Sequence, residues 1–135
     1  MSLKWSTLAN TETHNLGAGG RMRILIVDDD LSVVDTLCRL IRGLGHEALG
    51  VTSGVAALDR FRRASYDLVV VDLVMLPMTG LELLRQLRNI NRDTRLVALT
   101  GKLPELGKTL ATGGIPIVRK PIVTTADARA LIGVG

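Results

Sequence analysis

Carboxylate side chains directly follow two apolar runs of this 135-residue chain. The apolar run at 24–27 leads into the triplet Asp28–Asp30, and the run at 68–71 leads into Asp72. Continuous apolar runs of this length are typical of strands buried on both faces of a parallel sheet, and ligands bind outside the carboxyl ends of such strands. Two strand ends would thus bring several carboxylates to one edge, where hard oxygen ligands favour a divalent cation such as Mg²⁺.

Two further polar groups follow expected strands later in the chain. Thr100 follows residues 95–99, and Lys120 follows residues 115–118. A hydroxyl supplies one hydrogen-bond donor, and a lysine supplies a mobile positive charge. Together with a carboxylate nucleophile and a cation that offsets the repulsion between two anions, these groups suit phosphoryl transfer to an aspartate.

Strands and helices that alternate along the chain would position these groups. Asp30 and Ser53 are expected to cap two of the helices. Five β-α units predict an α/β fold with a five-stranded parallel sheet in the order 2-1-3-4-5 and helices on both faces, the doubly wound, flavodoxin-like arrangement. The expected strands are 23–28, 47–51, 67–71, 95–99 and 115–118, and the expected helices are 31–43, 54–64, 81–90, 103–112 and 124–132.

Composition indicates a single domain with an aliphatic core. The residues AVILMFWYC make up 47% of the chain, but aromatic residues only 2%. The lone Cys38 excludes an internal disulfide, and its place on the apolar face of the helix at 31–43 predicts a buried core residue. No apolar run approaches the roughly 20 residues of a membrane span, and no signal-peptide pattern opens the chain. We therefore expect a cytoplasmic protein that does not contact the membrane.

The chain is basic, with a formal charge of +4 from 17 Lys+Arg and 13 Asp+Glu. Most arginines fall at helical spacing opposite apolar stripes, which favours solvated helix faces over a surface for an acidic partner or a nucleic acid.

Residues 1–21 are polar and end in a glycine-rich stretch, so we interpret them as a flexible tail, part of which could come from an expression vector. Residues 22–135 would form the domain.

Four segments, in this order and spacing, resemble a response-regulator receiver domain of bacterial two-component signalling, over about residues 22–132. The resemblance implies that Asp72 is the phosphoacceptor. It also implies that Asp29 binds Mg²⁺ directly, that Asp28 binds it through water, and that the backbone carbonyl of Val74 completes the protein's share of the coordination. The matching segments are ILIVDDD at 24–30, YDLVVVDL at 66–73, VALT at 97–100 and VRKP at 118–121.

The same resemblance implies roles for the later segments and for partners. Thr100 would hydrogen-bond one phosphoryl oxygen, Lys120 would pair with another, and the peptide bond before Pro121 would be cis. The phosphoryl group would come from a sensor histidine kinase or a phosphotransfer protein. A downstream output domain, a partner protein or a homodimer would receive the signal. Enzymatic activity would be limited to Mg²⁺-dependent self-phosphorylation and autodephosphorylation at Asp72, and this domain would not bind DNA directly.

Two departures from the family pattern leave alternatives open. The proline of the loop after the phosphoacceptor comes one place later than usual, at Pro77, and Ile117 replaces the usual aromatic switch residue three places before Lys120. A receiver that serves as a docking or dimerisation scaffold without phosphorylation is one alternative. A phosphatase of the haloacid-dehalogenase type is a second, because Asp28 and Asp30 satisfy its Asp-x-Asp motif; it would need a further acidic pair after Lys120, where only Asp127 follows.

Overall fold

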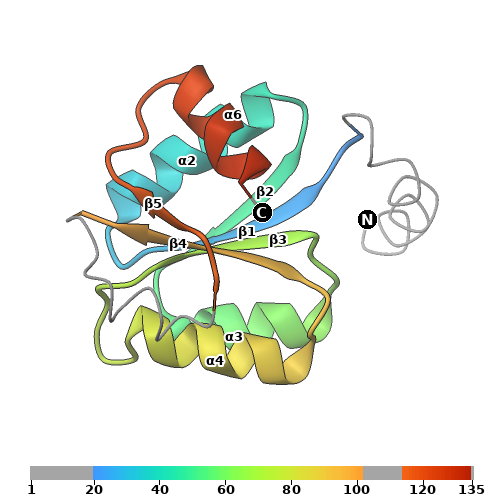
Figure 1. Ribbon diagram of the computed structural model, residues 1–135, viewed down its shortest axis with the longest axis vertical. Helices are drawn as coiled ribbons and strands as arrows, with labels where there is room; N and C mark the ends of the chain where they lie inside the picture. The colour runs from blue at the N-terminus through green and yellow to red at the C-terminus, as the bar shows by residue number, and fades with distance from the viewer. Residues whose placement is uncertain (1–19, 102–113, 135) are drawn as a thin grey trace.

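The computed structural model describes residues 20–101 and 114–134 (Figure 1). The tail predicted for 1–21 therefore falls almost wholly outside the described residues, and the helix predicted for 103–112 falls entirely outside them. Within the described ranges, no helix is long and apolar enough to cross a membrane.

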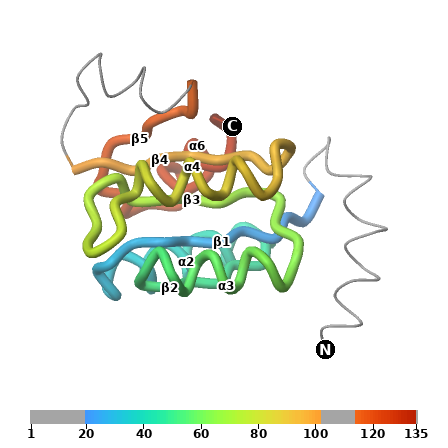
Figure 2. The backbone as a smooth tube through the Cα atoms, turned by 90° about the horizontal axis from the view of Figure 1, so that it is seen from below, coloured from blue at the N-terminus to red at the C-terminus, as the bar shows by residue number. Residues whose placement is uncertain are grey.

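Five parallel strands form one sheet in the order β2-β1-β3-β4-β5. Figure 2 shows the strands succeeding one another from β2 at one side to β5 at the other. This order confirms the doubly wound fold predicted from the sequence. The strands are β1 (Arg23–Val27), β2 (Glu47–Val51), β3 (Leu68–Asp72), β4 (Arg95–Thr100) and β5 (Ile117–Arg119).

Helices cover both faces of the sheet, as predicted. Figure 1 shows α2 and α6 on one face and α3 and α4 on the other. The predicted N-caps are confirmed: the Asp30 side chain accepts a hydrogen bond from the Ser32 N–H at 2.9 Å, and Ser53 accepts one from the Ala56 N–H at 3.1 Å. The helices are α2 (Leu31–Gly43), α3 (Gly54–Arg63), α4 (Gly80–Ile90) and α6 (Thr125–Gly133).

The sheet divides an aliphatic core into two layers. Ile24 and Ile26 of β1 face the α2 and α6 layer, and Leu25 and Val27 face the α3 and α4 layer. All four side chains are fully buried, as expected for a strand covered on both faces. Cys38 is buried in the α2 and α6 layer, where burial raises the pKa of its thiol, so the prediction of a core residue is confirmed.

The last strand differs from its prediction. It begins at Ile117 rather than at 115 and extends to Arg119. Ile117, which stands where an aromatic residue was expected, is partly buried against the α3 and α4 layer. The aliphatic side chain of Ile117 therefore fills the position of the aromatic switch residue, and no aromatic ring can change rotamer there.

Gly80 lets α4 begin directly against the end of β3. A Cβ atom at this position would lie 2.0 Å from the carbonyl oxygen of Asp72 and 2.6 Å from the Cα of Leu73. These neighbours are backbone atoms, so they cannot move aside as a flexible side chain would. The close approach is what places the first turn of α4 beside the acidic edge of the sheet.

We expect Gly80→Ala to lower the free energy of unfolding by about 1–3 kcal/mol or more, because the overpacked methyl group must displace backbone. Urea denaturation measures the change. Gly43→Ala is the matched control: nothing lies within 4 Å of a Cβ there, so this substitution should be neutral or stabilising by up to ~1 kcal/mol. Equal stability of Gly80→Ala and Gly43→Ala would contradict the close approach.

Candidate functional site

Strand register brings the predicted polar groups to one edge of the sheet. Val27 pairs with Val71, so Asp28, just past the end of β1, lies beside Asp72, the last residue of β3. Thr100 closes β4 and pairs with Arg119 of β5, which places Lys120 one residue beyond. The Lys120 N–H donates to the carbonyl oxygen of Thr100 at 2.7 Å and holds the start of the following loop.

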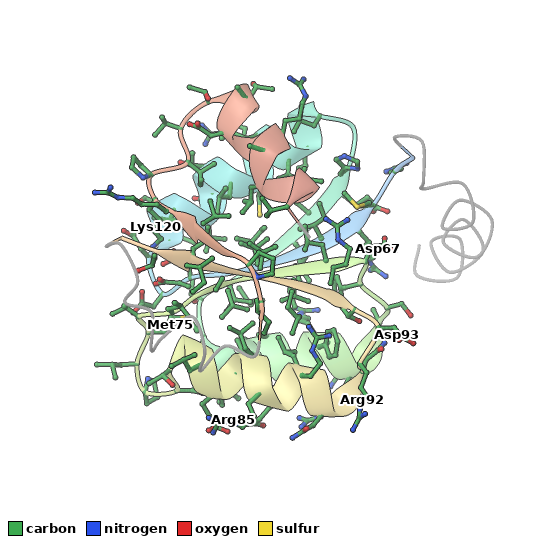
Figure 3. The ribbon with its side chains drawn as sticks, in the orientation of Figure 1. Asp67, Met75, Arg85, Arg92, Asp93 and Lys120 are labelled. Carbon is green, nitrogen blue, oxygen red and sulfur yellow. The ribbon has the colours of Figure 1, made fainter. Side chains whose placement is uncertain are left out.

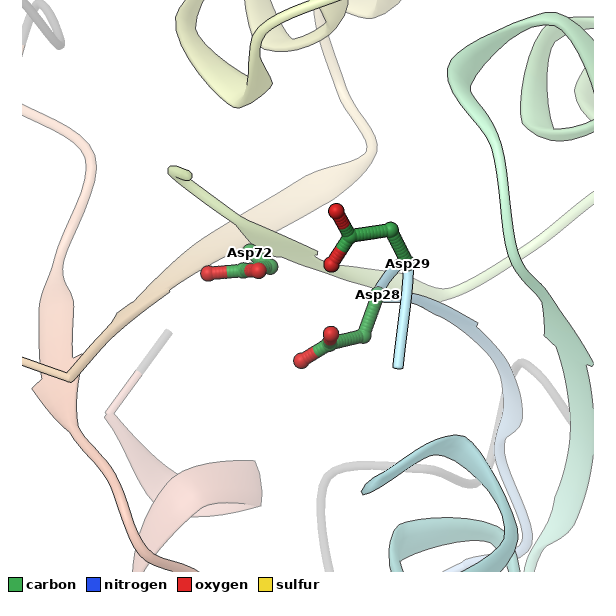
Figure 4. A group of neighbouring side chains, drawn as sticks. All are labelled: Asp28, Asp29 and Asp72. Carbon is green, nitrogen blue, oxygen red and sulfur yellow. The ribbon is translucent and has the colours of Figure 1, made fainter. Parts of the chain in front are cut away.

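Three carboxylates converge at this edge (Figure 4). One oxygen each of Asp28, Asp29 and Asp72 lies within 4.8 Å of the others. Asp28 and Asp72 are buried, whereas Asp29 is exposed. Asp30, the last member of the triplet, instead caps α2 with its side chain and does not join the cluster.

Lys120 neutralises part of this negative charge. Its Nζ lies 2.6 Å from Oδ2 of Asp28 and 3.5 Å from Oδ2 of Asp72. The Asp28 Oδ2 atom is buried, and the ammonium group of Lys120 is its one partner among the described residues. Its other oxygen accepts the Asp30 N–H at 3.0 Å. The lysine thus lies closer to the fully buried carboxylate than to Asp72.

The pKa values of Asp72 and Lys120 are both raised, for different reasons. Burial raises the pKa of Asp72 and the charge of Asp28 raises it further, against the opposing effects of the Val74 N–H and Lys120. Burial works against the charged form of Lys120, but the hydrogen bond and charge of Asp28 and the charge of Asp72 outweigh it, so the pKa of Lys120 also rises. Asp72 is therefore a carboxylate whose negative charge the fold tolerates poorly.

The loop after β3 holds Asp72 through its backbone. The Val74 N–H donates to Oδ1 of Asp72 at 3.2 Å, while the Val74 side chain is 72% exposed. The peptide bonds before Pro77 and Pro121 are both cis. The cis bond before Pro121 was expected from the resemblance. The cis bond before Pro77 was not expected, because its one local sign is the shifted position of this proline.

The residues at this edge fit a hard divalent cation. The donor set consists of carboxylate oxygens, which Mg²⁺ prefers, and Lys120 is the one cation that pairs with them in the described part of the chain. Beside its contact with Lys120, the buried Asp28 Oδ2 atom has a second lone pair that could accept a hydrogen bond from a metal-bound water. Asp28, Asp29 and Asp72, with the backbone of Val74, could hold such an ion.

Comparisons with known proteins point to one family. A family model described as the response regulator receiver domain matches residues 24–131. Sensory transduction protein RegX3 of Mycobacterium tuberculosis is 38% identical over 111 residues, which cover 81% of this chain and 47% of that protein. The chain therefore spans about half the length of this curated relative.

Solved structures agree on the fold. Chemotaxis protein CheY4 of Vibrio cholerae superposes with a TM-score of 0.76 at 23% identity, covering 83% of this chain and 96% of that one. Response regulator protein TrrA of Thermotoga maritima, solved in complex with Mg²⁺-BeF, gives a TM-score of 0.68 at 29% identity, covering 74% of this chain and 87% of that one.

Proposed function

Because this chain belongs to the response regulator receiver domain family, we propose that it is a phosphoryl-accepting switch that carries its phosphoryl group on Asp72. The observation that supports this most is the buried Asp72 carboxylate, flanked by two other carboxylates and by Lys120 at one edge of the sheet. A two-component receiver of this kind takes a phosphoryl group and changes the surface that it presents.

Asp72 is the nucleophile in this proposal. The donor is a phosphorylated histidine. The Oδ2 atom of Asp72 forms a bond to phosphorus while the bond from phosphorus to the imidazole nitrogen of this histidine breaks, and the imidazole leaves with that electron pair. The Val74 N–H holds the other oxygen, Oδ1, so the side chain is oriented before the donor arrives. The poor solvation that raises the pKa of Asp72 also makes this carboxylate more nucleophilic.

We assign Asp29, Asp72 and the Val74 carbonyl as direct ligands of Mg²⁺ and Asp28 as a ligand through water. When bound, the ion would neutralise charge on the transferring oxygens and align the phosphoryl group. Asp28 also fixes the ammonium group of Lys120. Of the three carboxylates, Asp29 is the exposed one.

Lys120 and Thr100 would stabilise the phosphorylated state. Lys120 Nζ already lies 3.5 Å from the Asp72 oxygen that would carry the phosphoryl group, so a small side-chain movement brings it to a phosphoryl oxygen. Thr100 is buried at the end of the neighbouring strand β4, where its hydroxyl can donate to another oxygen. Both groups interact with the phosphoryl charge and so favour the phosphorylated conformation.

A sensor histidine kinase or a phosphotransfer protein would supply the phosphoryl group in the cytoplasm. Relatives such as RegX3 are longer than this chain, so the receiver would report to an output domain, a partner protein or a second copy. The phosphatase alternative is weaker, because the acidic residues that it needs are engaged elsewhere. Asp30 caps α2, and Asp127 accepts the N–H groups of Val123 and Thr124 at the start of α6.

The proposal is tested by incubating the protein with acetyl phosphate, with and without Mg²⁺. We expect a single acid-stable, base-labile phosphoryl group, found only with Mg²⁺ and mapped to Asp72 by mass spectrometry. Because aspartyl phosphates hydrolyse, the intact protein should be measured soon after mixing. Absence of label with Mg²⁺ present would favour the phosphorylation-independent scaffold.

Mg²⁺ should bind weakly before phosphorylation, because the ion keeps several waters and uses only one or two carboxylates. Amide NMR signals should shift at residues 28–30 and 72–75 when Mg²⁺ is added. The surface carboxylates of Glu47 and Glu82 serve as internal controls. Shifts confined to those two positions would argue against the assigned ligands.

A further inference from the structure

The edge of the sheet opposite the acidic site is basic and hollowed. Figure 3 shows Lys120 and Met75 at one end of the molecule and Asp67, Arg92 and Asp93 at the other. Three open hollows of about 270, 380 and 360 Å³ lie at this second end, and Thr94 lines all three. They therefore adjoin one another and form a continuous groove across the amino ends of the strands and the carboxyl ends of α3 and α4.

Arginines lie at both ends of this groove. Arg62 lines the hollow beside α3, and Arg92 lines the hollow beside β4. Both are exposed, and neither side chain forms a hydrogen bond or an ion pair with another described residue. In contrast, Arg63 pairs with Asp59 at 3.0 Å.

Arginines near helix carboxyl ends also neutralise the partial negative charge of the helix. That role is already filled here. Arg88 donates to the carbonyl oxygens of Arg92 and Thr94 beyond α4, both at 2.9 Å. Arg62 shares the last turn of α3 with Arg60 and Arg63. Arg92 lies beyond the end of α4, whose last turn already contains Arg88. Both therefore add positive charge at helix ends where other arginines are present.

Two further features of the groove favour a ligand. Arg95 lines two of the hollows, and its buried Nε atom has no hydrogen-bond partner in the described part of the chain, although its other two nitrogens donate to Met22 and Ile132. Ile90 is 42% exposed beside Phe61 and Tyr66, which form the apolar wall of the third hollow. The groove therefore combines unpaired cations with an apolar contact surface.

We propose that this groove docks an acidic segment of a partner protein that also carries an apolar side chain. Acidic side chains of the segment would pair with Arg62 and Arg92, and the apolar side chain would contact Ile90. The carboxylates of Asp67 and Asp93 lie in the central hollow. They interrupt the positive charge of the groove, which disfavours the continuous phosphates of a nucleic acid. A peptide can instead place its acidic side chains at the two arginines and its backbone N–H groups at these carboxylates.

The test is fluorescence anisotropy with a fluorescein-labelled glutamate peptide that carries one central leucine. Arg62→Glu/Arg92→Glu should weaken binding by about tenfold at low salt, as expected for two charges on the rim of an interface. Arg39→Glu/Arg129→Glu changes the net charge equally on the α2 and α6 layer and is the matched control; it should change binding by less than about twofold. Circular dichroism confirms that each variant is folded.

Ile90→Asn should weaken binding with no change in charge, which separates the apolar contact from general electrostatics. The Arg62→Glu/Arg92→Glu variant should accept phosphoryl groups like the unchanged protein, because the groove lies at the opposite end from Asp72. Equal losses in the two charge-reversed variants would overturn the proposal. So would no peptide binding, or a duplex DNA that binds more tightly than the peptide through the same arginines.

Discussion

Asp72→Asn should abolish labelling by acetyl phosphate. The amide is nearly isosteric with the carboxylate, but its nitrogen and neutral oxygen cannot act as the anionic nucleophile. Hydrogen bonding to the Val74 N–H can persist through the amide oxygen, so the fold should survive. We expect at least a ~10³-fold loss of labelling, which corresponds to about 4 kcal/mol in the transition state.

Asp93→Asn is the matched control for this experiment. Asp93 is exposed at the opposite end of the molecule and lies outside the acidic cluster. It should label like the unchanged protein, as measured by intact mass under identical conditions. Label that persists on Asp72→Asn would assign the phosphoacceptor to another carboxylate, with Asp29 the first to be examined.

The same Asp72→Asn substitution should stabilise the fold at neutral pH. Burial and the charge of Asp28 raise the pKa of Asp72, so the folded state binds this proton more tightly than the unfolded chain does. The ionised side chain therefore costs stability above the raised pKa, and the cost disappears as the pH falls through it. Urea denaturation should show a higher free energy of unfolding for the variant at neutral pH and a smaller difference in acid.

The sequence predicted the sheet well because the hydrophobic pattern of each strand is a local signal, and the right-handed crossover rule then limits the order of parallel strands. Runs such as 24–27 and 68–71 can be buried only between two helical layers, and short connections leave few arrangements. The carboxylates at Asp28 and Asp72 then meet at one edge as a consequence of parallel register. Strand β5 was placed less well, because its few residues lie beside a glycine-rich stretch with little periodicity.

Contacts between distant backbone segments could not be predicted in this way. Nothing local indicates that Gly80 abuts the carbonyl of Asp72. Nothing local indicates either that Lys120 lies closer to Asp28, at 2.6 Å, than to Asp72, at 3.5 Å. Arg62 was expected on a solvated helix face, and it also borders a groove. The groove could not be predicted locally, because it arises where the carboxyl ends of α3 and α4 come together.

Lys120→Met should destabilise the protein, because it leaves the fully buried Asp28 carboxylate without its cation. Removing one partner of a buried pair costs ~3–5 kcal/mol. Because the Lys120 side chain is 21% exposed and water can partly replace it, we expect a loss of about 2 kcal/mol at neutral pH. Chemical denaturation measures the loss, and Arg119→Met is the control, since Arg119 is exposed and pairs with no carboxylate of the described residues.

The dependence of this loss on pH and on Asp28 identifies its cause. The pKa of Lys120 is raised above its ordinary value of 10.5, so its contribution is present at neutral pH and is lost only as the pH rises through the raised value. As the pH falls through the raised pKa of Asp72, Lys120 has one anion fewer to neutralise, and the loss should shrink.

Adding Asp28→Asn to Lys120→Met should recover most of the stability, because the uncompensated charge is then gone. If the double variant instead loses the sum of the two single effects, the ion pair between Lys120 and Asp28 is not what stabilises this edge of the sheet.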